Sequence, residues 1–328
     1  MLLGAQPTID PQIRHRLQTA DGTVVVARDL NRFTTFCHEQ RDRYAGLVIV
    51  DATADAEVAS RYPAWLAAGI HIVTPNKKAF AGDLTLWEAM HDATRVAQAA
   101  GRPSHVLHES TVGAGLPVLS TLNDLLATGD EVHTIEGIFS GTLSYLFNRY
   151  STVAGDAPPF SEIVATARQL GYTEPDARDD LSGADVARKV VILARVCGLH
   201  LSLADFTVEN LVPAALQDAS IDAHAFLTRL AESDAAMAAR QAAARQAGQV
   251  LRYVGHVDVA ARTARVSLAA YPASHPFASL QGSDNMVAFT TRRFPQPLTI
   301  QGAGAGAAVT AFGMMADLLR LQRSVVRC

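Results

Sequence analysis

Short apolar runs alternate with longer amphipathic segments over the first third of the chain. Four such runs predict buried strands at Val24–Ala27, Leu47–Val50, His71–Val73 and Val106–His108. The segments between them predict helices at Ala54–Ala68 and Leu84–Ala100. Alternating strands and helices favour an α/β fold with a doubly wound parallel sheet. Ligands are then expected at the carboxyl ends of the strands.

Beyond Pro117 the pattern changes to helices followed by strands of alternating polarity. Helices are predicted from Pro117 to about Leu126, at Ser161–Leu170, Ser182–Val196 and Ala223–Ala247, and at the C-terminus to about Leu321. Strands are predicted around Val132–Phe139 and at Gln249–Val259, Thr263–Ala270, Met286–Phe294 and Leu298–Gln301. Gly171 and Gly198 stand where helices are expected to end. The alternating runs suggest antiparallel pairing, which makes this region α+β.

Composition narrows the class of protein. The 328 residues are 49% apolar and 18% charged, with a net charge of −4, which argues against disorder and against a nucleic-acid-binding surface. No apolar run approaches the roughly 18 residues of a membrane span. The three cysteines, Cys37, Cys197 and Cys328, form no close pair, so neither a disulfide framework nor a zinc site is indicated. We therefore expect a globular protein of the cytoplasm.

A glycine-rich run, Gly302–Ala307, follows a strand and begins a helix. It is similar to a dinucleotide-binding turn, but only 22 residues follow Gly306, too few for the strand that should come next. Two explanations stay open. The small residues let either a ligand or a packed helix approach the backbone closely.

Polar residues follow two of the predicted strands. Thr53 comes after Leu47–Val50, and the pair Lys77–Lys78 comes after His71–Val73. These side chains are either solvated surface groups or part of a ligand site at one sheet edge. The segment His108–Leu116 combines a carboxylate with a loop rich in glycine, which is either a tight turn or a source of oxygen ligands for a hard cation.

The densest polar segment is Gly171–Asp180, and the helix after it carries Asp185 and Lys189. Four residues apart, these two side chains share one helix face. They form either an exposed ion pair or a partly buried acid–base group, since the same helix is strongly apolar and burial lowers the pKa of a lysine.

Several of these segments together resemble the homoserine dehydrogenase family, in its monofunctional type. The resemblance covers nearly the whole chain from about Val48 and is carried by Thr74–Phe80, Glu109–Pro117, Glu136–Tyr145, Gly171–Asp180, Asp185–Lys189, Ser274–Leu280 and Gly302–Thr310. It implies a Rossmann-like nucleotide-binding domain at residues 1–107, completed by a C-terminal helix at 307–328. Residues 108–306 would form the catalytic and dimerisation domain.

The resemblance also implies the chemistry. The reaction would be the reversible reduction of L-aspartate 4-semialdehyde to L-homoserine by NADP(H) or NAD(H), a step toward threonine and methionine. Lys189 would donate and accept the proton at the substrate oxygen, with Lys77 as its partner amine. The substrate-binding carboxylates would be Glu174, Asp185, Asp179 and Asp180, the first two gripping the ammonium group of homoserine.

Cofactor and metal sites follow from the same resemblance. Thr53, Lys77 and Gly306 would bind the cofactor, Thr53 and Gly306 at its nicotinamide end. A sodium ion would be held by oxygens of Glu109, Val112, Ala114 and Leu116, through backbone carbonyls in the last three. A homodimer is implied, and neither nucleic acid nor a membrane is expected as a partner.

The N-terminus departs from the family pattern. Members begin with a strand and a G-x-G-x-x-G turn that binds the pyrophosphate, whereas Met1–Ile9 contain a single glycine, Gly4. Since a strand–helix unit takes about 30 residues, roughly the first 35 residues of a typical member are expected to be missing. The alternative function is therefore a truncated, catalytically weak homologue that acts only as a dimerising, non-enzymatic protein.

Overall fold

The computed structural model describes residues 29–44, 46–153, 155 and 157–325. The chain divides into two units, Met1–Ala45 and Gly46–Cys328. The described part of the first unit holds α2 (Leu30–Arg41), which begins where the Asp29 carboxylate accepts a hydrogen bond from the Arg32 N–H at 2.9 Å. The predicted strand Val24–Ala27 and the predicted lack of a phosphate-binding turn in Met1–Ile9 both lie outside the described residues.

Three parallel strands form a small sheet in the order β1-β2-β3. They are β1 (Val48–Val50), β2 (His71–Val73) and β3 (Val106–Leu107), as the apolar runs predict. Four helices belong to the same region, α3 (Ala56–Ser60), α4 (Tyr62–Ala67), α5 (Lys78–Ala81) and α6 (Leu84–Ala99). The central strand β2 is buried throughout, because neighbours cover both its edges and its faces.

The prediction of one helix over Ala54–Ala68 is wrong. The segment forms two helices that meet at Arg61, and Pro63 lies in the first turn of the second. Proline lacks an N–H and is tolerated there but not in a helix interior. The break lets Tyr62 and Trp65 turn into the core, where both are almost fully buried.

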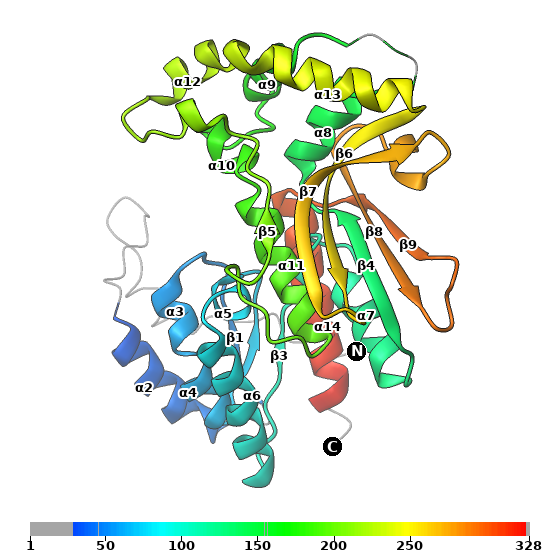
Figure 1. The fold of residues 1–328 in the computed structure, drawn as a ribbon. Coiled ribbons are helices and arrows are strands. Elements are labelled where there is room, and N and C mark those ends of the chain that lie inside the picture. The colour runs from blue at the N-terminus through cyan, green and yellow to red at the C-terminus, as the bar shows by residue number, and fades with distance from the viewer. Residues whose placement is uncertain (1–28, 45, 154, 156, 326–328) are drawn as a thin grey trace. The chain divides into compact units, whose positions relative to one another are not determined.

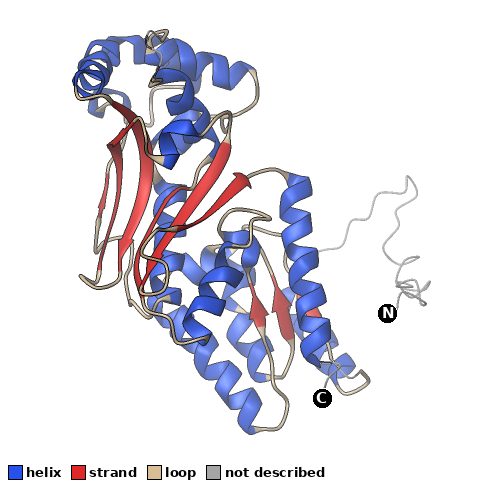
Figure 2. Ribbon diagram, turned by 90° about the vertical axis from the view of Figure 1, so that its right-hand side faces the viewer, coloured by secondary structure: helices blue, strands red, loops and turns tan. Residues whose placement is uncertain are grey.

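Six strands form a second, larger sheet in the order β5-β7-β6-β4-β8-β9. Their bounds are β4 (Val132–Ile138), β5 (Thr207–Val208), β6 (Gln249–Asp258), β7 (Thr263–Pro272), β8 (Asp284–Thr291) and β9 (Leu298–Ala303). The predicted antiparallel pairing of the alternating runs is confirmed. The short β5, which the pattern did not predict, runs parallel to β7. In Figure 2 the strands of the two sheets form separate groups. The fold is therefore α/β with a parallel sheet, joined to a mixed-sheet region.

Helices accompany the larger sheet and gather beyond one of its ends, where α9, α12 and α13 lie together (Figure 1). The helices are α7 (Val118–Ala127), α8 (Gly141–Tyr150), α9 (Phe160–Gln169), α10 (Ala177–Leu181), α11 (Ala184–Val196), α12 (Ala223–Arg229), α13 (Asp234–Gln246) and α14 (Ala307–Val325). Four short 3-10 segments are η1 (Glu109–Thr111), η2 (Ala214–Leu216), η3 (Leu230–Ser233) and η4 (Pro276–Ser279). Among the described residues, every helix is too short or too polar to cross a bilayer.

The prediction of a single helix over Ala223–Ala247 is also wrong. The 3-10 segment η3 separates α12 from α13. Leu230 is almost fully buried at this break, and Asp234 accepts hydrogen bonds from the N–H and hydroxyl of Ser161, at 2.9 and 2.5 Å. Tertiary contacts thus override the high helix propensity of the alanine-rich run.

The buried helix α11 packs against β6 and β7 on one side and against α5 on the other. At its C-terminal end, Arg195 donates hydrogen bonds to the backbone carbonyls of Phe80 at 2.9 Å and Gly82 at 2.8 Å. The helix therefore connects the larger sheet to the region of the smaller one. The predicted domain boundary at residues 107 and 108 falls between β3 and η1 and stays a prediction.

Gly183, which precedes α11, gives a stability prediction. Its φ is +72°, and a Cβ there would overlap the Tyr253 hydroxyl. Gly183→Ala is expected to lower the free energy of unfolding by about 2–4 kcal/mol, from left-handed strain and overpacking together. The matched control is Gly248→Ala, where φ is +67° and nothing lies within 4 Å, so strain acts alone. Urea unfolding should show the larger loss at Gly183, and equal losses would contradict the packing argument.

Candidate active site

The candidate site starts from α11. Asp185 lies in its first turn, and Lys189 lies one turn later on the same face, as the spacing predicts. The Lys189 ammonium is 2.7 Å from Asp185 Oδ2 and donates a hydrogen bond of 2.7 Å to the backbone carbonyl of Phe139. Lys189 is only 7% exposed. The pair is therefore a partly buried group rather than a solvated surface ion pair.

A second lysine reaches the same carboxylate from another element. Lys77 follows β2 and lies directly before α5, and its Nζ is 3.3 Å from Asp185 Oδ1. Burial alone would raise the pKa of Asp185, but the two lysine charges outweigh it and hold that pKa well below its ordinary value. Burial lowers the pKa of Lys77 despite the opposing charge of Asp185, and Lys189 lowers it further. One carboxylate thus keeps two ammonium groups close together.

Asp185 and Lys189 line a cleft of about 620 Å³, whereas Lys77 is not among its lining residues. Its lining includes Glu174, Asp179 and Asp180, so the structure brings together the four predicted substrate-binding carboxylates. Asp180 accepts a hydrogen bond of 2.8 Å from the Glu174 N–H. Burial raises the pKa of Asp180, with a further contribution from the charges of Glu174 and Asp179. The cleft is therefore suited to a ligand that carries a positive charge.

The glycine-rich turn lines the same cleft. Gly304, Ala305 and Gly306 contribute to it, just before α14 begins. Gly306 is exposed, whereas Gly304 is buried against Asn285, where a Cβ would overlap the amide. Close packing thus accounts for Gly304, and the position of Gly306 suits ligand contact.

Thr53 lies at the carboxyl edge of the small sheet. It is exposed, follows β1, and donates its N–H to Asp51 Oδ1 at 2.7 Å. It is not among the residues that line the cleft of Lys189. Strand β2, which pairs with β1, leads into Lys77. Two of the three predicted cofactor residues, Thr53 and Lys77, therefore extend from adjacent strands at the same sheet edge.

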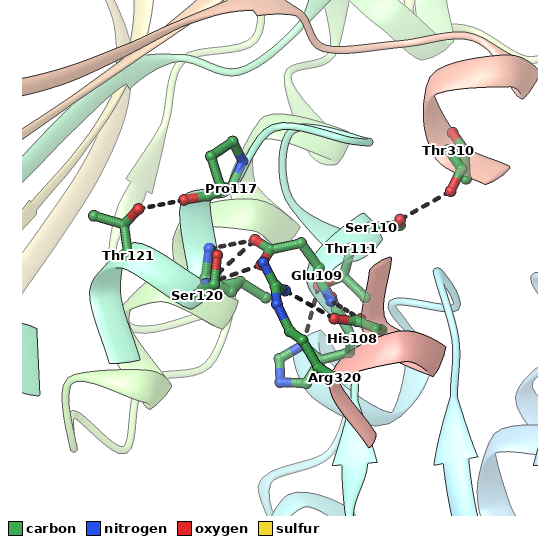
Figure 3. A network of polar contacts seen from close by, with 11 residues as sticks. His108, Glu109, Ser110, Thr111, Pro117, Ser120, Thr121, Thr310 and Arg320 are labelled. Carbon is green, nitrogen blue, oxygen red and sulfur yellow. Dashed lines mark hydrogen bonds and ion pairs between the residues drawn. The ribbon is translucent and has the colours of Figure 1, made fainter. Parts of the chain in front are cut away.

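The predicted sodium loop is arranged differently from a carboxylate-based cation site. Both carboxylate oxygens of Glu109 are engaged, since they accept N–H groups at the start of α7 from Leu119 at 2.7 Å and Ser120 at 3.0 Å. Arg320 lies 2.8 Å from Glu109 Oε2 (Figure 3). The Glu109 side chain therefore does not fit a cation ligand. The predicted sodium site is left with the backbone oxygens of this loop and stays a prediction. Among the described residues, no cluster of three or more His, Cys, Asp or Glu side chains suits a metal ion.

The nicotinamide end of a dinucleotide fits the residues present. Exposed small residues of the turn line a cleft that also holds Lys189. Asp185 of the same cleft contacts Lys77, which follows a strand of the parallel sheet. Fold and site together define a nicotinamide-dependent oxidoreductase.

Comparisons with known proteins identify the family. A family model described as homoserine dehydrogenase matches residues 117–319, and one described as the NAD-binding domain of homoserine dehydrogenase matches residues 10–102. The homoserine dehydrogenase of Emericella nidulans is 52% identical over 280 residues, which cover 84% of this chain and 75% of that protein. The enzyme of Saccharomyces cerevisiae is 46% identical over 278 residues, with the same coverage of 84% and 75%. The chain belongs to the homoserine dehydrogenase family.

Other similar proteins include a longer bifunctional relative and solved structures. A bifunctional aspartokinase/homoserine dehydrogenase of Zea mays is 50% identical over 290 residues, but the chain spans only 30% of its length. A solved Candida auris protein of unknown function is 43% identical with a TM-score of 0.86, covering 94% of this chain and 87% of that one. A hyperthermophilic archaeal homoserine dehydrogenase in complex with NADPH shares the fold, with a TM-score of 0.63 at 19% identity over 94% and 80% of the two chains. The non-enzymatic alternative finds no support in these relatives.

Sequence reasoning missed a buried network behind Thr53 and Lys77. The Asp51 carboxylate accepts hydrogen bonds from the Tyr62 hydroxyl and, at 3.0 Å, from the Asn76 amide, besides the Thr53 N–H. Burial alone would raise the pKa of Asp51, but these hydrogen bonds outweigh it and lower the pKa. One carboxylate therefore sets the positions of the loops after β1 and β2. The available signal was an aspartate directly after an apolar strand, in Val48–Asp51.

Asp51→Asn tests this network. An amide would direct N–H groups at existing donors, and losing charged hydrogen bonds costs roughly 1.5–3 kcal/mol each. We expect the free energy of unfolding in urea to fall by at least about 2 kcal/mol. The KM for the cofactor should rise, because the loops that carry Thr53 and Lys77 lose their common anchor. Because the pKa of Asp51 is lowered, its stabilisation is present above the ordinary carboxyl pKa and fades as pH falls through the lowered value.

The matched control is Asp83→Asn. Asp83 accepts only the Thr85 N–H, at 2.9 Å, as the N-cap of α6. Its loss should cost about 1 kcal/mol and leave the cofactor KM unchanged. An Asp51 variant that behaves like this control would contradict the positioning role.

Proposed function

We propose that the chain catalyses the reversible reduction of L-aspartate 4-semialdehyde to L-homoserine with NADP(H) or NAD(H), a step toward threonine and methionine. The observation that carries this proposal is the buried ammonium of Lys189, which lines the cleft and is held by Asp185 and the Phe139 carbonyl. A fixed, partly buried amine suits proton transfer to a substrate oxygen.

The two lysines handle the proton transfer in this reaction. The bound cofactor supplies or accepts the hydride at the substrate carbon. In the reduction, negative charge develops on the carbonyl oxygen, and Lys189 donates the proton that converts it to a hydroxyl group. In the oxidation, Lys189 accepts that proton. Lys77 supports this exchange, since its charge acts on the same carboxylate and its lowered pKa brings it closer to neutral pH.

The carboxylates hold the amino-acid end of the substrate. Glu174 and Asp185 contact its ammonium group, and Asp179 and Asp180 add negative charge to the same cleft. Charge-assisted hydrogen bonds are stronger than neutral ones, so this set favours an α-amino aldehyde over an uncharged aldehyde. Thr53, Lys77 and Gly306 contact the cofactor, with Thr53 and Gly306 at its nicotinamide end.

Three further proposals rest on family membership. Backbone oxygens of Glu109, Val112, Ala114 and Leu116 hold a sodium ion, in agreement with the engagement of the Glu109 carboxylate elsewhere. The chain works in the cytoplasm. It forms a homodimer, since closed twofold symmetry is the commonest arrangement of soluble oligomers. The region of β6–β8 is the proposed interface.

The test of the activity is Lys189→Met, which keeps the apolar stem and removes the ammonium. Since general acid catalysis is worth roughly 10²- to 10⁴-fold, turnover of aspartate semialdehyde should fall by that range while circular dichroism stays normal. Lys78→Met, at an exposed neighbour of Lys77, is the control and should keep full turnover. A Lys189 variant within threefold of the parent would remove this residue from the mechanism.

The proposed homodimer is tested by measuring the mass of the protein in solution. Light scattering should report about twice the chain mass of 34.9 kDa. A stable, active monomer would contradict the proposal.

A further inference from the structure

Asn285, on β8, is a buried amide without a partner. The residue is 0% exposed, and neither Oδ1 nor Nδ2 has a hydrogen-bond partner among the residues that the structure describes. Buried polar groups are nearly always hydrogen-bonded, so an amide with both ends open needs an explanation. The buried Asn285 amide therefore indicates a hydrogen-bond partner that the described residues do not supply in this conformation.

The amide lies directly behind the wall of the cleft. Asn285 is opposite Gly302 in the β8–β9 register, and its side chain occupies the place where a Cβ of Gly304 would be. Gly304, Ala305 and Gly306 line the cleft, together with Lys189. The Asn285 amide therefore packs against the backbone of a turn that itself lines the cleft.

This turn can change its backbone conformation at low cost. Gly306 has a φ of +111°, in a region that glycine adopts freely, whereas Gly302 at the other end stays paired with β8. The residues between them are small, so no side chain has to be repacked when peptide groups rotate. A modest rotation would direct an N–H or C=O of the turn toward the Asn285 amide.

We propose that Asn285 is a positioning residue of the cofactor site: its amide forms hydrogen bonds with the backbone of the Gly302–Gly306 turn when the nicotinamide end of the cofactor enters the cleft. The inference rests on the proposed function, because it needs a nicotinamide cofactor at this turn. Without cofactor, no described residue pairs with the amide. In the complex it fixes the turn against the ligand.

Asn285→Leu separates this role from simple packing, because leucine has the same branching as asparagine but no polar atoms. Without cofactor, the variant should have an unchanged or higher Tm, since an unpaired amide is removed. With cofactor, the dissociation constant for NADPH or NADH should rise at least tenfold, measured by cofactor fluorescence. The KM for homoserine should change less than the KM for the cofactor. Asn285→Ala should give the same rise in the dissociation constant and serves if leucine does not fit.

Asn148→Leu is the matched control. Asn148 on α8 also has an unpartnered Oδ1 among the described residues, but its Nδ2 donates to the Ser144 hydroxyl at 3.1 Å and the Gly282 carbonyl at 3.0 Å. This variant should lower the Tm and leave cofactor affinity unchanged.

The outcomes are distinguishable. A parent that binds cofactor together with an Asn285→Leu variant that binds it equally well would overturn the inference alone, and would mean that packing or a bound water accounts for the amide. A parent that binds neither NADPH nor NADH would overturn the proposed function and, with it, this inference.

Discussion

The Asp185 carboxylate holds two ammonium groups that would otherwise repel each other, with Lys189 at 2.7 Å and Lys77 at 3.3 Å. The two lysines come from different elements, α11 and the loop after β2, so this one carboxylate also determines how the larger sheet meets the region of the smaller one. Paired charges of this kind are stable in a partly buried cleft only when each has a partner. The backbone carbonyl of Phe139 gives Lys189 a further hydrogen-bond acceptor.

The helix that carries Asp185 is tied to α5 at both of its ends. Asp185 meets Lys77 directly before α5, and Arg195 donates to the Phe80 and Gly82 carbonyls at its other end. Behind Lys77, the Asp51 network joins the loop of Asn76 to the loop of Thr53. Rigid support from two directions is what a site needs when small displacements of a reacting group reduce the rate.

The C-terminal helix completes the site from the far end of the sequence. Asp317 accepts the Glu109 N–H at 2.9 Å, and Arg320 binds both Glu109 and Asp317. Gly313 of α14 approaches the backbone of the Ala114–Gly115 loop, where a Cβ would overlap Ala114 O. The loop predicted to bind sodium is thus shaped by residues about 200 positions away, and the same helix follows the glycine-rich turn of the cleft.

Local signals in the sequence determined much of this protein. Apolar runs marked all three strands of the small sheet, and alternation marked β6, β7 and β8, because periodicity records which face of an element is buried. The spacing of Asp185 and Lys189 determined that they meet, since residues four apart on a helix are neighbours. The resemblance to the family predicted Glu174, Asp179 and Asp180 as substrate-binding carboxylates without showing that they line one cleft.

Only the tertiary structure decided the long-range contacts. It placed β4 between β6 and β8, broke the alanine-rich segment at η3, and gave the Glu109 carboxylate to α7 and Arg320 instead of a cation. It also joined Asp51 to Asn76 and set the unpaired Asn285 amide behind Gly304. The physical reason is the same in each case. Hydrogen bonds and packing between residues far apart in the chain depend on relative positions in space, and no local pattern of polarity encodes them.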